Sequence, residues 1–440
     1  MKISGWGRYP VVDCKVTAPR DAAALVAAQA AGPLIARGNG RAYGDSALNR
    51  TGTVSTRRLN RMIAFDEKTG QLVAEAGVVL GDIVTAFLPR GWFLSVTPGT
   101  RFVTLGGAIA ADVHGKNHHK EGGFGNFVDW IDVMGPDGRV RRASRGDNAD
   151  LFGWTLGGMG LTGVILRAAI RLRRVETGWI RQVTRPAPDL DAAMAAFDAA
   201  DDATYSVAWI DCLSSGAALG RSVVMWGEHA PLAGLPTTLR QIPFGPPSRR
   251  RLAVPFNAPA MALNRWTVRA FNALYFRGGL RRAGLSHVPW DTYFYPLDAI
   301  LGWNRIYGRR GFLQFQCVLP QASARDGLIA LLTQTSRAGQ GSFLAVLKKM
   351  GAQGGPFSFP MPGYTLALDF PATPKVFALM DRLDRITLDH GGRFYLAKDA
   401  RLSAETLRAA DPRVEAFTRM RREDGAARAF ASLQSERLKL

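Results

Sequence analysis

The stretch Leu34-Ile35-Ala36-Arg37-Gly38-Asn39-Gly40-Arg41-Ala42-Tyr43-Gly44-Asp45-Ser46 runs from a short apolar strand into a glycine-rich loop. Because Gly38 and Gly40 lack Cβ atoms, the backbone N–H groups of this loop can face an anion such as a phosphate. The third glycine falls at the wrong spacing for a dinucleotide fingerprint, and no Gly-Lys-Ser/Thr follows as in a Walker loop. The stretch therefore indicates a phosphate-binding loop of another kind, with an ordinary strand-turn as the alternative.

A run of small residues follows at positions 97–115. It reads Thr97-Pro98-Gly99-Thr100 and then Val103-Thr104-Leu105-Gly106-Gly107-Ala108-Ile109-Ala110-Ala111-Asp112-Val113-His114-Gly115. Small side chains let an extended or planar ligand lie against the backbone, whose N–H groups can bond a diphosphate or a ring edge. Close packing of a helix through glycine and alanine is the alternative. A third glycine-rich segment, at 151–165, is explained adequately as a tight loop between a helix and a strand.

Three of the six histidines of the chain lie in His114-Gly115-Lys116-Asn117-His118-His119. A metal site is the main alternative to an anion or substrate site at these residues. However, Gly115 and Asn117 disfavour a helix, and the glutamate of an H-E-x-x-H zinc motif is missing. We therefore expect no metal ion and favour an anion or substrate site over a solvated loop.

Polar side chains also interrupt apolar strands later in the chain. Gln314 and Gln316 share one face of the apolar run 312–319, which indicates either a solvent-facing strand or the floor of a polar pocket. Lys398 follows the strand-like run 393–396 in a chain whose usual cation is arginine, and this hints at a compact donor or acid. No G-x-S-x-G motif occurs, and no cysteine stands in an electropositive motif, so hydrolase chemistry has little support.

The charge of the chain is strongly positive. Its 440 residues carry a formal net charge of +20, and 47% of them are hydrophobic, which suits two domains with sizeable cores. Residues 229–290 contain nine arginines and no acidic residue. Such a field attracts polyanions or an anionic membrane, although an arginine-rich composition can also reflect a GC-rich genome. No nucleic-acid-binding motif accompanies the charge, so nucleic acid is not an expected partner.

Within this basic stretch, Leu263, Trp266, Ala270 and Leu274 recur at helical spacing. The pattern makes residues 239–290 a candidate membrane-facing segment, with a mobile basic loop and a core helix as alternatives. No apolar run is long enough to span a bilayer, and the first residues lack the apolar core of a signal peptide. We therefore expect a protein that is cytoplasmic or peripheral on the inner membrane.

The pattern of strands and helices changes twice along the chain. Residues 1–176 are dominated by short strands and turns, including a hairpin predicted around Gly135-Pro136-Asp137-Gly138. Residues 177–392 add longer helices, at 190–200 and 324–338, between apolar strands. Residues 393–440 are a strand followed by charged helices. This predicts an α+β fold with a first domain at 1–176 and a second domain with an antiparallel sheet at 177–392.

Taken together, the motifs resemble the FAD-linked oxidases of the vanillyl-alcohol oxidase superfamily, which have a non-Rossmann FAD-binding domain. The resemblance rests on residues 37–41, 98–100, 106–107 and 154–160. It narrows, through 114–119, 303–305, 311–316, 368–371 and 395–399, to members that oxidise a polyprenyl-phosphoryl ribose. It implies that residues 1–176 bind FAD, that 177–392 bind substrate, and that 393–440 return to the FAD domain. The histidine that bonds the flavin in many relatives is missing from Gly40-Arg41-Ala42, so non-covalent FAD is implied.

The resemblance also implies the site residues. FAD would be held by Ala36, Arg37, Gly38, Asn39, Gly40, Arg41, Ala42, Tyr43, Gly44, Asp45, Ser46, Gly99, Thr104, Leu105, Gly106, Gly107, Ala111, Asp112, Val113, His114, Ile165 and Tyr395. The substrate would be bound by Lys116, Gln314, Gln316, Lys348 and Lys398. Lys398 would act on the hydroxyl as base or orienting group, with Tyr43 and His114 as catalytic neighbours.

The implied reaction moves a hydride from C2 of the sugar to flavin N5 and gives the 2-keto sugar, the first half of an epimerisation to arabinose for the cell wall. A ketosugar product implies an NAD(P)H-dependent short-chain reductase as the partner that completes this epimerisation, and a prenyl tail implies a membrane surface. FAD-dependent oxidation of a soluble sugar, alditol or aldonolactone is the alternative.

Overall fold

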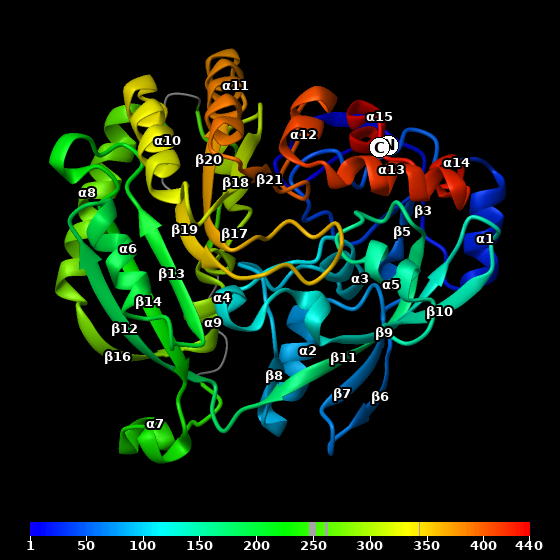
Figure 1. Ribbon diagram of the computed structural model, residues 1–440. Helices are drawn as coiled ribbons and strands as arrows, with labels where there is room; N and C mark the ends of the chain where they lie inside the picture. The colour runs from blue at the N-terminus through cyan, green and yellow to red at the C-terminus, as the bar shows by residue number, and fades with distance from the viewer. Residues whose placement is uncertain (246–251, 260–262, 343) are drawn as a thin grey trace.

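The computed structural model describes residues 1–245, 252–259, 263–342 and 344–440. The fold is α+β, as predicted, and its two largest sheets are antiparallel. Figure 1 shows the larger sheet and its helices on the left, and the N-terminal elements with the C-terminal helices on the right. Within the described ranges, no helix combines the length and the apolar character that crossing a membrane would need.

The first large sheet is formed by residues 62–174. Its strands follow the order β10-β9-β11-β7-β6, and β8 pairs with the far end of β11. The predicted hairpin is confirmed, because β9 pairs with β10 around the turn at 135–138, where Gly138 has a φ of +74°. The elements are β6 (Met62–Asp66), β7 (Gln71–Glu75), α2 (Leu80–Phe87), β8 (Trp92–Leu94), α3 (Leu105–Ala110), α4 (His118–Glu121), β9 (Val128–Met134), β10 (Val140–Ser144), α5 (Ala149–Thr155) and β11 (Val164–Arg174).

A small parallel sheet carries the glycine loop. Its order is β3-β5-β4, and the loop leaves the end of β4. The N-terminal elements are β1 (Lys2–Ser4), β2 (Val11–Asp13), β3 (Val16–Thr17), α1 (Ala22–Ala30), β4 (Ile35–Arg37) and β5 (Thr53–Ser55). The C-terminal helices lie beside this sheet in Figure 1, and a bridge between Leu34 and Phe430 joins the two regions.

The second large sheet has the strand order β16-β12-β14-β13-β19-β20-β18-β21. Its strands are β12 (Trp179–Ala187), β13 (Tyr205–Ile210), β14 (Ser222–His229), β16 (Gly284–Pro289), β18 (Phe312–Pro320), β19 (Ala345–Met350), β20 (Gly363–Pro371) and β21 (Arg393–Phe394). The helices and the remaining short strands of this part are α6 (Leu190–Asp198), α7 (Thr237–Arg240), β15 (Leu252–Ala253), α8 (Arg265–Arg281), α9 (Trp290–Phe294), β17 (Ile300–Leu301), α10 (Ala324–Ala338) and α11 (Pro374–Asp389).

The two faces of this sheet have different roles. Helices α6, α10 and α11 share one apolar core with Leu313 and Phe315 of β18 and with Leu366 and Leu368 of β20. Because side chains alternate along a strand, the residues between them point to the opposite face. That face carries Gln314 and Gln316, and it is the wall of a cavity rather than a solvent-facing surface.

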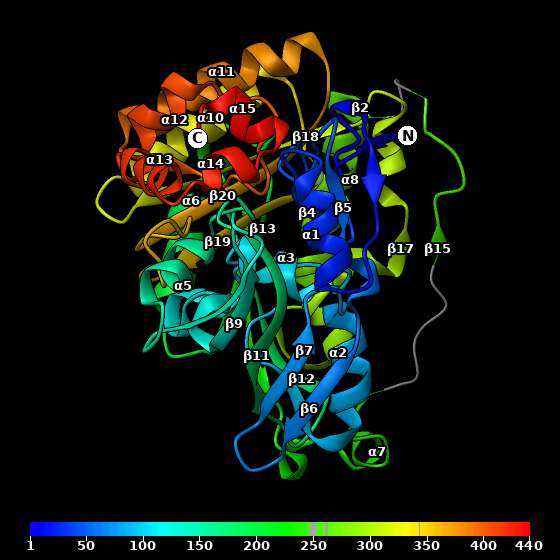
Figure 2. The ribbon, with the colours of Figure 1, turned by 90° about the vertical axis from the view of Figure 1, so that its right-hand side faces the viewer.

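The chain ends in four short helices beside the small parallel sheet (Figure 2). They are α12 (Ala404–Ala410), α13 (Arg413–Glu423), α14 (Ala426–Ala429) and α15 (Leu433–Leu438). The predicted boundary at 176–177 falls between β11 of one sheet and β12 of the other. The division into domains at 176 and 392 stays a prediction.

Candidate active site

A cavity of about 410 Å³ lies between the glycine loop, the small-residue segment and the open face of the second large sheet. It brings together most of the residues singled out from the sequence. Those that line it are Ala36, Gly38, Asn39, Gly40, Arg41, Ala42, Tyr43, Ser46, Gly99, Thr104, Gly106, Gly107, Ala111, Val113, His114, Lys116, Ile165, Gln314, Gln316, Lys348, Tyr395 and Lys398.

Five of the predicted cofactor residues do not line the cavity. Arg37 donates to the carbonyl of Ser4, and Asp45 pairs with Arg437. Leu105 is fully buried in the core of the first large sheet. The carboxylate of Asp112 accepts hydrogen bonds from the Gly125 amide and the Ser358 hydroxyl. Gly44 packs so closely on the turn at Asp399 that a Cβ would lie 2.1 Å from its carbonyl oxygen. All five hold the surrounding loops in place.

Two pairs of segments approach each other at glycines: the glycine loop with the start of α3, and α3 with the residue that follows β7. A Cβ on Gly38 would lie 2.1 Å from Thr104 Oγ1, and one on Gly106 would lie 2.8 Å from the Cβ of Ala76. Thr104 caps α3 by accepting from the Gly107 amide at 3.3 Å. Glycine at these positions is therefore required by the close approach of two backbone segments that both line the cavity.

Lys398 lies at the polar end of the cavity and packs on the ring of Tyr43. Its Nζ atom is 3.7 Å from the ring centroid. Burial lowers the pKa of Lys398 to about 7, although the nearby carboxylate of Asp369 acts in the opposite direction. Near neutral pH this lysine can therefore exist in both protonation states, as a proton acceptor requires.

Asp369 belongs to the motif at 368–371, but it was not among the site residues predicted from the sequence. It is fully buried on β20, and burial raises its pKa to about 7. Gln314, its cross-strand partner, donates to one carboxylate oxygen. The other oxygen has no hydrogen-bond partner among the described residues. A single aspartate inside an apolar strand was the signal that could have identified it.

Two more lysines enter the same end of the cavity. Burial lowers the pKa of Lys116 to about 7 and that of Lys348 to about 8. The Lys116 ammonium donates to the carbonyl of Tyr293 and lies 4.1 Å from the centroid of its ring. Lysines are almost never buried without an anionic partner, so their clustering indicates a site for an anionic or strongly polar ligand.

His114 lies next to these lysines and is neutral. Burial first, and then the charges of Lys348 and Lys398, hold its pKa well below the ordinary value. Its Nε2 atom is 3.1 Å from the amide nitrogen of Gln316, which also donates to the Thr365 hydroxyl at 3.2 Å. A neutral ring that accepts at Nε2 carries its proton at Nδ1, and this buried atom has no partner among the described residues.

The cavity also has an apolar wall that was not predicted. It is formed by Val207, Trp209, Met225, Tyr275, Leu297, Ile300, Leu301, Leu344 and Val346. Trp209 of β13 packs against Tyr275 of α8 with their ring centroids 4.6 Å apart. Apolar side chains that line a cavity cannot be told from core side chains in a sequence, so no local signal separated them.

FAD fits the residues that line this cavity. The diphosphate of FAD suits a cavity with four cationic side chains, Arg41, Lys116, Lys348 and Lys398, against the one carboxylate of Asp298 among its described lining residues. The unpartnered buried atoms Arg41 Nε and His114 Nδ1 are both donors on lining residues. Tyr395 donates to the carbonyl of Ala111 at 3.1 Å and so joins the C-terminal segment to the small-residue segment.

Comparison with known proteins agrees with this geometry. Residues 13–144 match the model of a family described as an FAD binding domain. The whole chain is 38% identical to the decaprenylphosphoryl-beta-D-ribose oxidase of Mycolicibacterium smegmatis, over 97% of that protein. This chain belongs to the FAD-linked oxidases of the vanillyl-alcohol oxidase superfamily. It is an FAD-dependent oxidoreductase.

Other relatives of this FAD-dependent oxidoreductase match over different lengths. An uncharacterized protein of Streptomyces coelicolor is 33% identical over 82% of this chain and all of its own length. The L-gulonolactone oxidase of Mus musculus is 29% identical over 30% of each chain. Among the described residues, no group of three or more His, Cys, Asp or Glu side chains is placed to hold a metal ion.

Proposed function

We propose that this chain oxidises the C2 hydroxyl of a polyprenyl-phosphoryl ribose to the 2-keto sugar, as the first half of an epimerisation to arabinose. One observation carries the proposal: the cavity that suits FAD has three lysines with lowered pKa values at one end and an apolar wall elsewhere. A phosphorylated sugar suits the lysines, and a prenyl chain suits the wall. The relative of the same length is named for a substrate of this kind.

The residues of the polar end have separate tasks in this reaction. When bound, FAD supplies the acceptor, at N5, for the hydride that leaves C2. Neutral Lys398 takes the proton of the C2 hydroxyl at Nζ as the carbonyl forms. Asp369 then stabilises the lysine in its charged form. Tyr43 holds the Lys398 side chain in place, and Gln316 with neutral His114 orients the sugar through uncharged hydrogen bonds.

Lys116 and Lys348 recognise the phosphate in this proposal. Both line the cavity and have lowered pKa values, so an approaching phosphodiester anion favours their charged forms and is bound in return. Gln314 already donates to Asp369, so its contact with the substrate is the least direct of the five predicted ones.

A soluble sugar, alditol or aldonolactone is the alternative substrate. The similarity to L-gulonolactone oxidase favours it, but that match covers only 30% of this chain. An apolar cavity wall has no role in binding a small soluble sugar. Oxygen consumption with simple sugars or lactones, and no reaction with prenyl-phosphoryl ribose, would favour the alternative.

We also propose non-covalent attachment of FAD. The loop Gly40-Arg41-Ala42 contains no histidine, and no cysteine stands among the described lining residues. His114 is the one histidine among them, and its Nε2 faces Gln316. Denaturation with acid or heat should release all the flavin into the supernatant, where its absorption can be measured. Yellow colour retained on the denatured chain would contradict this attachment.

Two partners complete the proposed function. The 2-keto product needs reduction on the other face of the sugar, which a separate NAD(P)H-dependent short-chain reductase would supply. A membrane surface would supply the prenyl substrate. Supporting this, Trp266 and Leu274 of α8 are each 67% exposed in a segment rich in arginine, while Tyr275 of the same helix lines the cavity. Residues 246–251 and 260–262 of the predicted segment 239–290 lie outside the described residues.

The test of the proposed function is a pair of activity measurements. Purified protein with bound FAD should be reduced by polyprenyl-phosphoryl ribose without oxygen. With the reductase and NAD(P)H added, the arabinose epimer should then accumulate. Reduction without formation of the epimer would support the oxidation and remove the proposed partner.

A further inference from the structure

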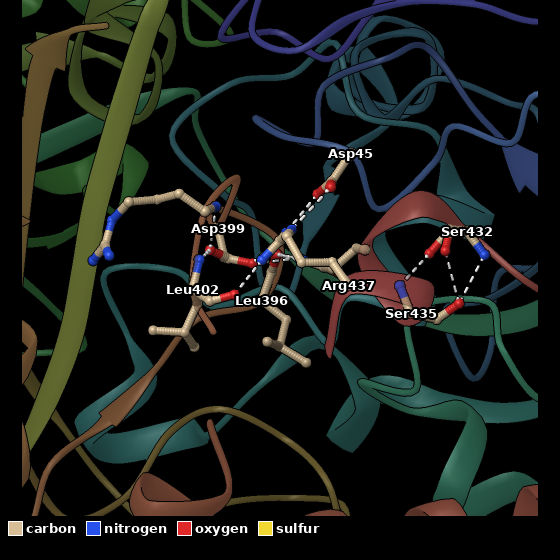
Figure 3. A network of polar contacts seen from close by, with 9 residues as sticks. Asp45, Leu396, Asp399, Leu402, Ser432, Ser435 and Arg437 are labelled. Carbon is tan, nitrogen blue, oxygen red and sulfur yellow. Dashed lines mark hydrogen bonds and ion pairs between the residues drawn. The ribbon is translucent and has the colours of Figure 1, made fainter. Parts of the chain in front are cut away.

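Lys398 contacts Tyr43 inside the cavity, and the two segments that carry these residues are also joined outside it. Tyr43 is followed two residues later by Asp45, and Lys398 is followed directly by Asp399. Both carboxylates are bound by one side chain, that of Arg437 in the last helix α15 (Figure 3). A loop from the start of the chain and a turn from its end are therefore joined in the cavity and outside it, in addition to the backbone hydrogen bond from the Tyr43 amide to the Ala397 carbonyl at 3.0 Å.

The geometry of the outer connection is specific for a guanidinium group. Arg437 Nη2 lies 2.7 Å from Asp45 Oδ1 and 2.9 Å from Asp399 Oδ2, and its Nε lies 3.2 Å from Asp45 Oδ2. Its Nη1 donates to the carbonyl of Leu402 at 2.6 Å. The planar fork thus uses three nitrogens on four acceptor atoms of three residues, which a lysine ammonium cannot reproduce.

The turn that carries Lys398 is also held on its outer side by its own backbone and by helix α15. Asp399 Oδ1 accepts from the amides of Arg401 and Leu402 and so closes the turn. Gln434 of α15 donates to the carbonyl of Leu396 at 2.8 Å and to Asp399 Oδ2 at 3.1 Å. Helix α15 is itself fixed at its start by reciprocal bonds between Ser432 and Ser435 (Figure 3). Through Gln434 and Arg437, one helix therefore holds both ends of the lysine turn.

Burial and ion pairing together decide the protonation states of Asp45 and Asp399. The side chains of Asp45 and Asp399 are only 6% and 7% exposed, and that of Arg437 is 25% exposed. Burial raises the pKa of Asp399, but the Arg437 charge and two backbone amides outweigh it and leave the pKa lowered. Burial raises the pKa of Asp45, which lacks those two amides, against the opposing effect of Arg437. The guanidinium is what keeps two buried carboxylates charged side by side.

We infer that Arg437 is a positioning residue for the active site: it sets the distance between the glycine loop that binds FAD and the turn that carries Lys398. Neither carboxylate lines the cavity, and Arg437 does not line it either. Its effect on the site passes through the backbone of the two segments. The inference rests on the proposed role of Lys398, and its main readouts do not use the sugar substrate.

Four variants test the inference. Arg437→Gln removes the fork, Arg437→Lys keeps the charge without the fork, and Asp45→Asn cuts only the connection to the glycine loop. Arg408→Gln is the matched control, because Arg408 also holds the end of the chain, through the carbonyls of Leu438 and Lys439, but contacts neither cavity segment. Flavin fluorescence gives the FAD dissociation constant, and a dye-referenced reductive titration at pH 6 gives the midpoint potential of bound FAD.

Arg437→Gln and Asp45→Asn should weaken FAD binding about tenfold. They should also slow flavin reduction by polyprenyl-phosphoryl ribose about 10- to 100-fold, because small displacements of reacting groups have effects of this size. The midpoint potential should shift to lower values, since a displaced ammonium stabilises the reduced flavin less. Arg437→Lys should give intermediate values, and Arg408→Gln should match the unmodified protein.

A lower melting temperature with unchanged FAD affinity, potential and reduction rate would overturn the inference, because Arg437 would then serve the fold alone. If Arg437→Gln does not fold, Asp45→Asn still tests the inference, because it keeps the pair of Arg437 with Asp399. The expected shifts in midpoint potential could occur while polyprenyl-phosphoryl ribose reduces the flavin of none of the proteins. That result would contradict the proposed substrate and leave the role of Arg437 supported.

Discussion

The polar end and the apolar wall of the cavity are built from the same strands but by different rules. Lys348 and Val346 are neighbours on β19, and Gln316 and Thr365 face the cavity from adjacent strands. At the polar end, side chains such as Gln316 and His114 make specific polar contacts, whereas the wall around Trp209 and Tyr275 is lined mainly by apolar side chains. The comparison teaches that the chemistry of the site and the choice of its substrate can be changed separately, and each prediction below tests that separation.

The largest effect is expected at Lys398. Lys398→Met removes the proton acceptor while keeping an unbranched chain over the Tyr43 ring. The rate of flavin reduction by polyprenyl-phosphoryl ribose should fall by about 10²- to 10⁴-fold, the usual contribution of a general base. Stopped-flow absorption without oxygen measures it. Lys349→Met, on the same strand as Lys348 but paired with Asp198 and Asp201, is the control and should keep the normal rate. A fast Lys398→Met enzyme would remove this lysine from the chemistry.

At the apolar wall the expected effect is smaller and of another kind. Trp209→Ala removes a large aromatic surface, so KM for the long-chain substrate should rise about tenfold with kcat nearly unchanged. A substrate with a short prenyl chain should show little change. Trp226→Ala is the control, because Trp226 lies on the face of β14 opposite to Met225 and does not line the cavity. A large fall in kcat for Trp209→Ala would break the separation between the two regions.

Asp369 tests the electrostatics of the polar end. A carboxylate favours the charged form of its lysine neighbour, so Asp369→Asn should lower the pKa of Lys398. The rate of flavin reduction rises with pH as Lys398 loses its proton, with a midpoint near pH 7 in the unmodified enzyme. In the variant this midpoint should move about one pH unit lower.

The control for Asp369 is Asp132→Asn, a buried carboxylate paired with Arg142 and Arg167 outside the cavity lining. Its pH profile should stay normal. If Asp369→Asn instead abolished reduction at every pH, Asp369 and not Lys398 would be the proton acceptor.

The smallest effect is expected at the outer surface of α8. Exchanging both Trp266 and Leu274 for serine should weaken binding to anionic vesicles about three- to tenfold and leave reduction by a short-chain substrate unchanged. Sedimentation with vesicles of phosphatidylglycerol measures it. Ile63→Ser, which removes an exposed apolar side chain on β6, is the control. Equal vesicle binding by the double variant and the unmodified protein would exclude α8 as the membrane contact.

The sequence predicted the parts of this site that depend on local chemistry. The glycine loop at 38–46 could be interpreted because a backbone facing an anion needs residues without Cβ atoms close together. The shared face of Gln314 and Gln316 followed from strand alternation, but only the structure distinguishes a pocket floor from a solvent-facing surface. Lys398 was only weakly marked by its place after the strand-like run 393–396 in an arginine-rich chain, and its role came from the resemblance. The strand itself, β21, ends at Phe394.

The parts that were missed depend on long-range contacts. Asp369 acts through Gln314 and Lys398, which lie 55 and 29 positions away in the chain. Trp209 meets Tyr275 only because α8 folds back over β13. Arg437 lies 392 positions from Asp45, and no spacing rule joins the two. Such pairs are set by the sheet order and by the return of the C-terminal helices, which a single sequence does not specify.

The central claim is that one cavity joins the FAD-binding loop to a lysine that accepts the proton of a lipid-linked ribose. The most direct measurement is the absorption spectrum of the purified, FAD-loaded protein as polyprenyl-phosphoryl ribose is added without oxygen. The account predicts that the flavin absorption band disappears, at a rate that increases as the pH rises through about 7. A flavin that stays oxidised with this substrate, and is bleached by a soluble sugar or lactone, would contradict it.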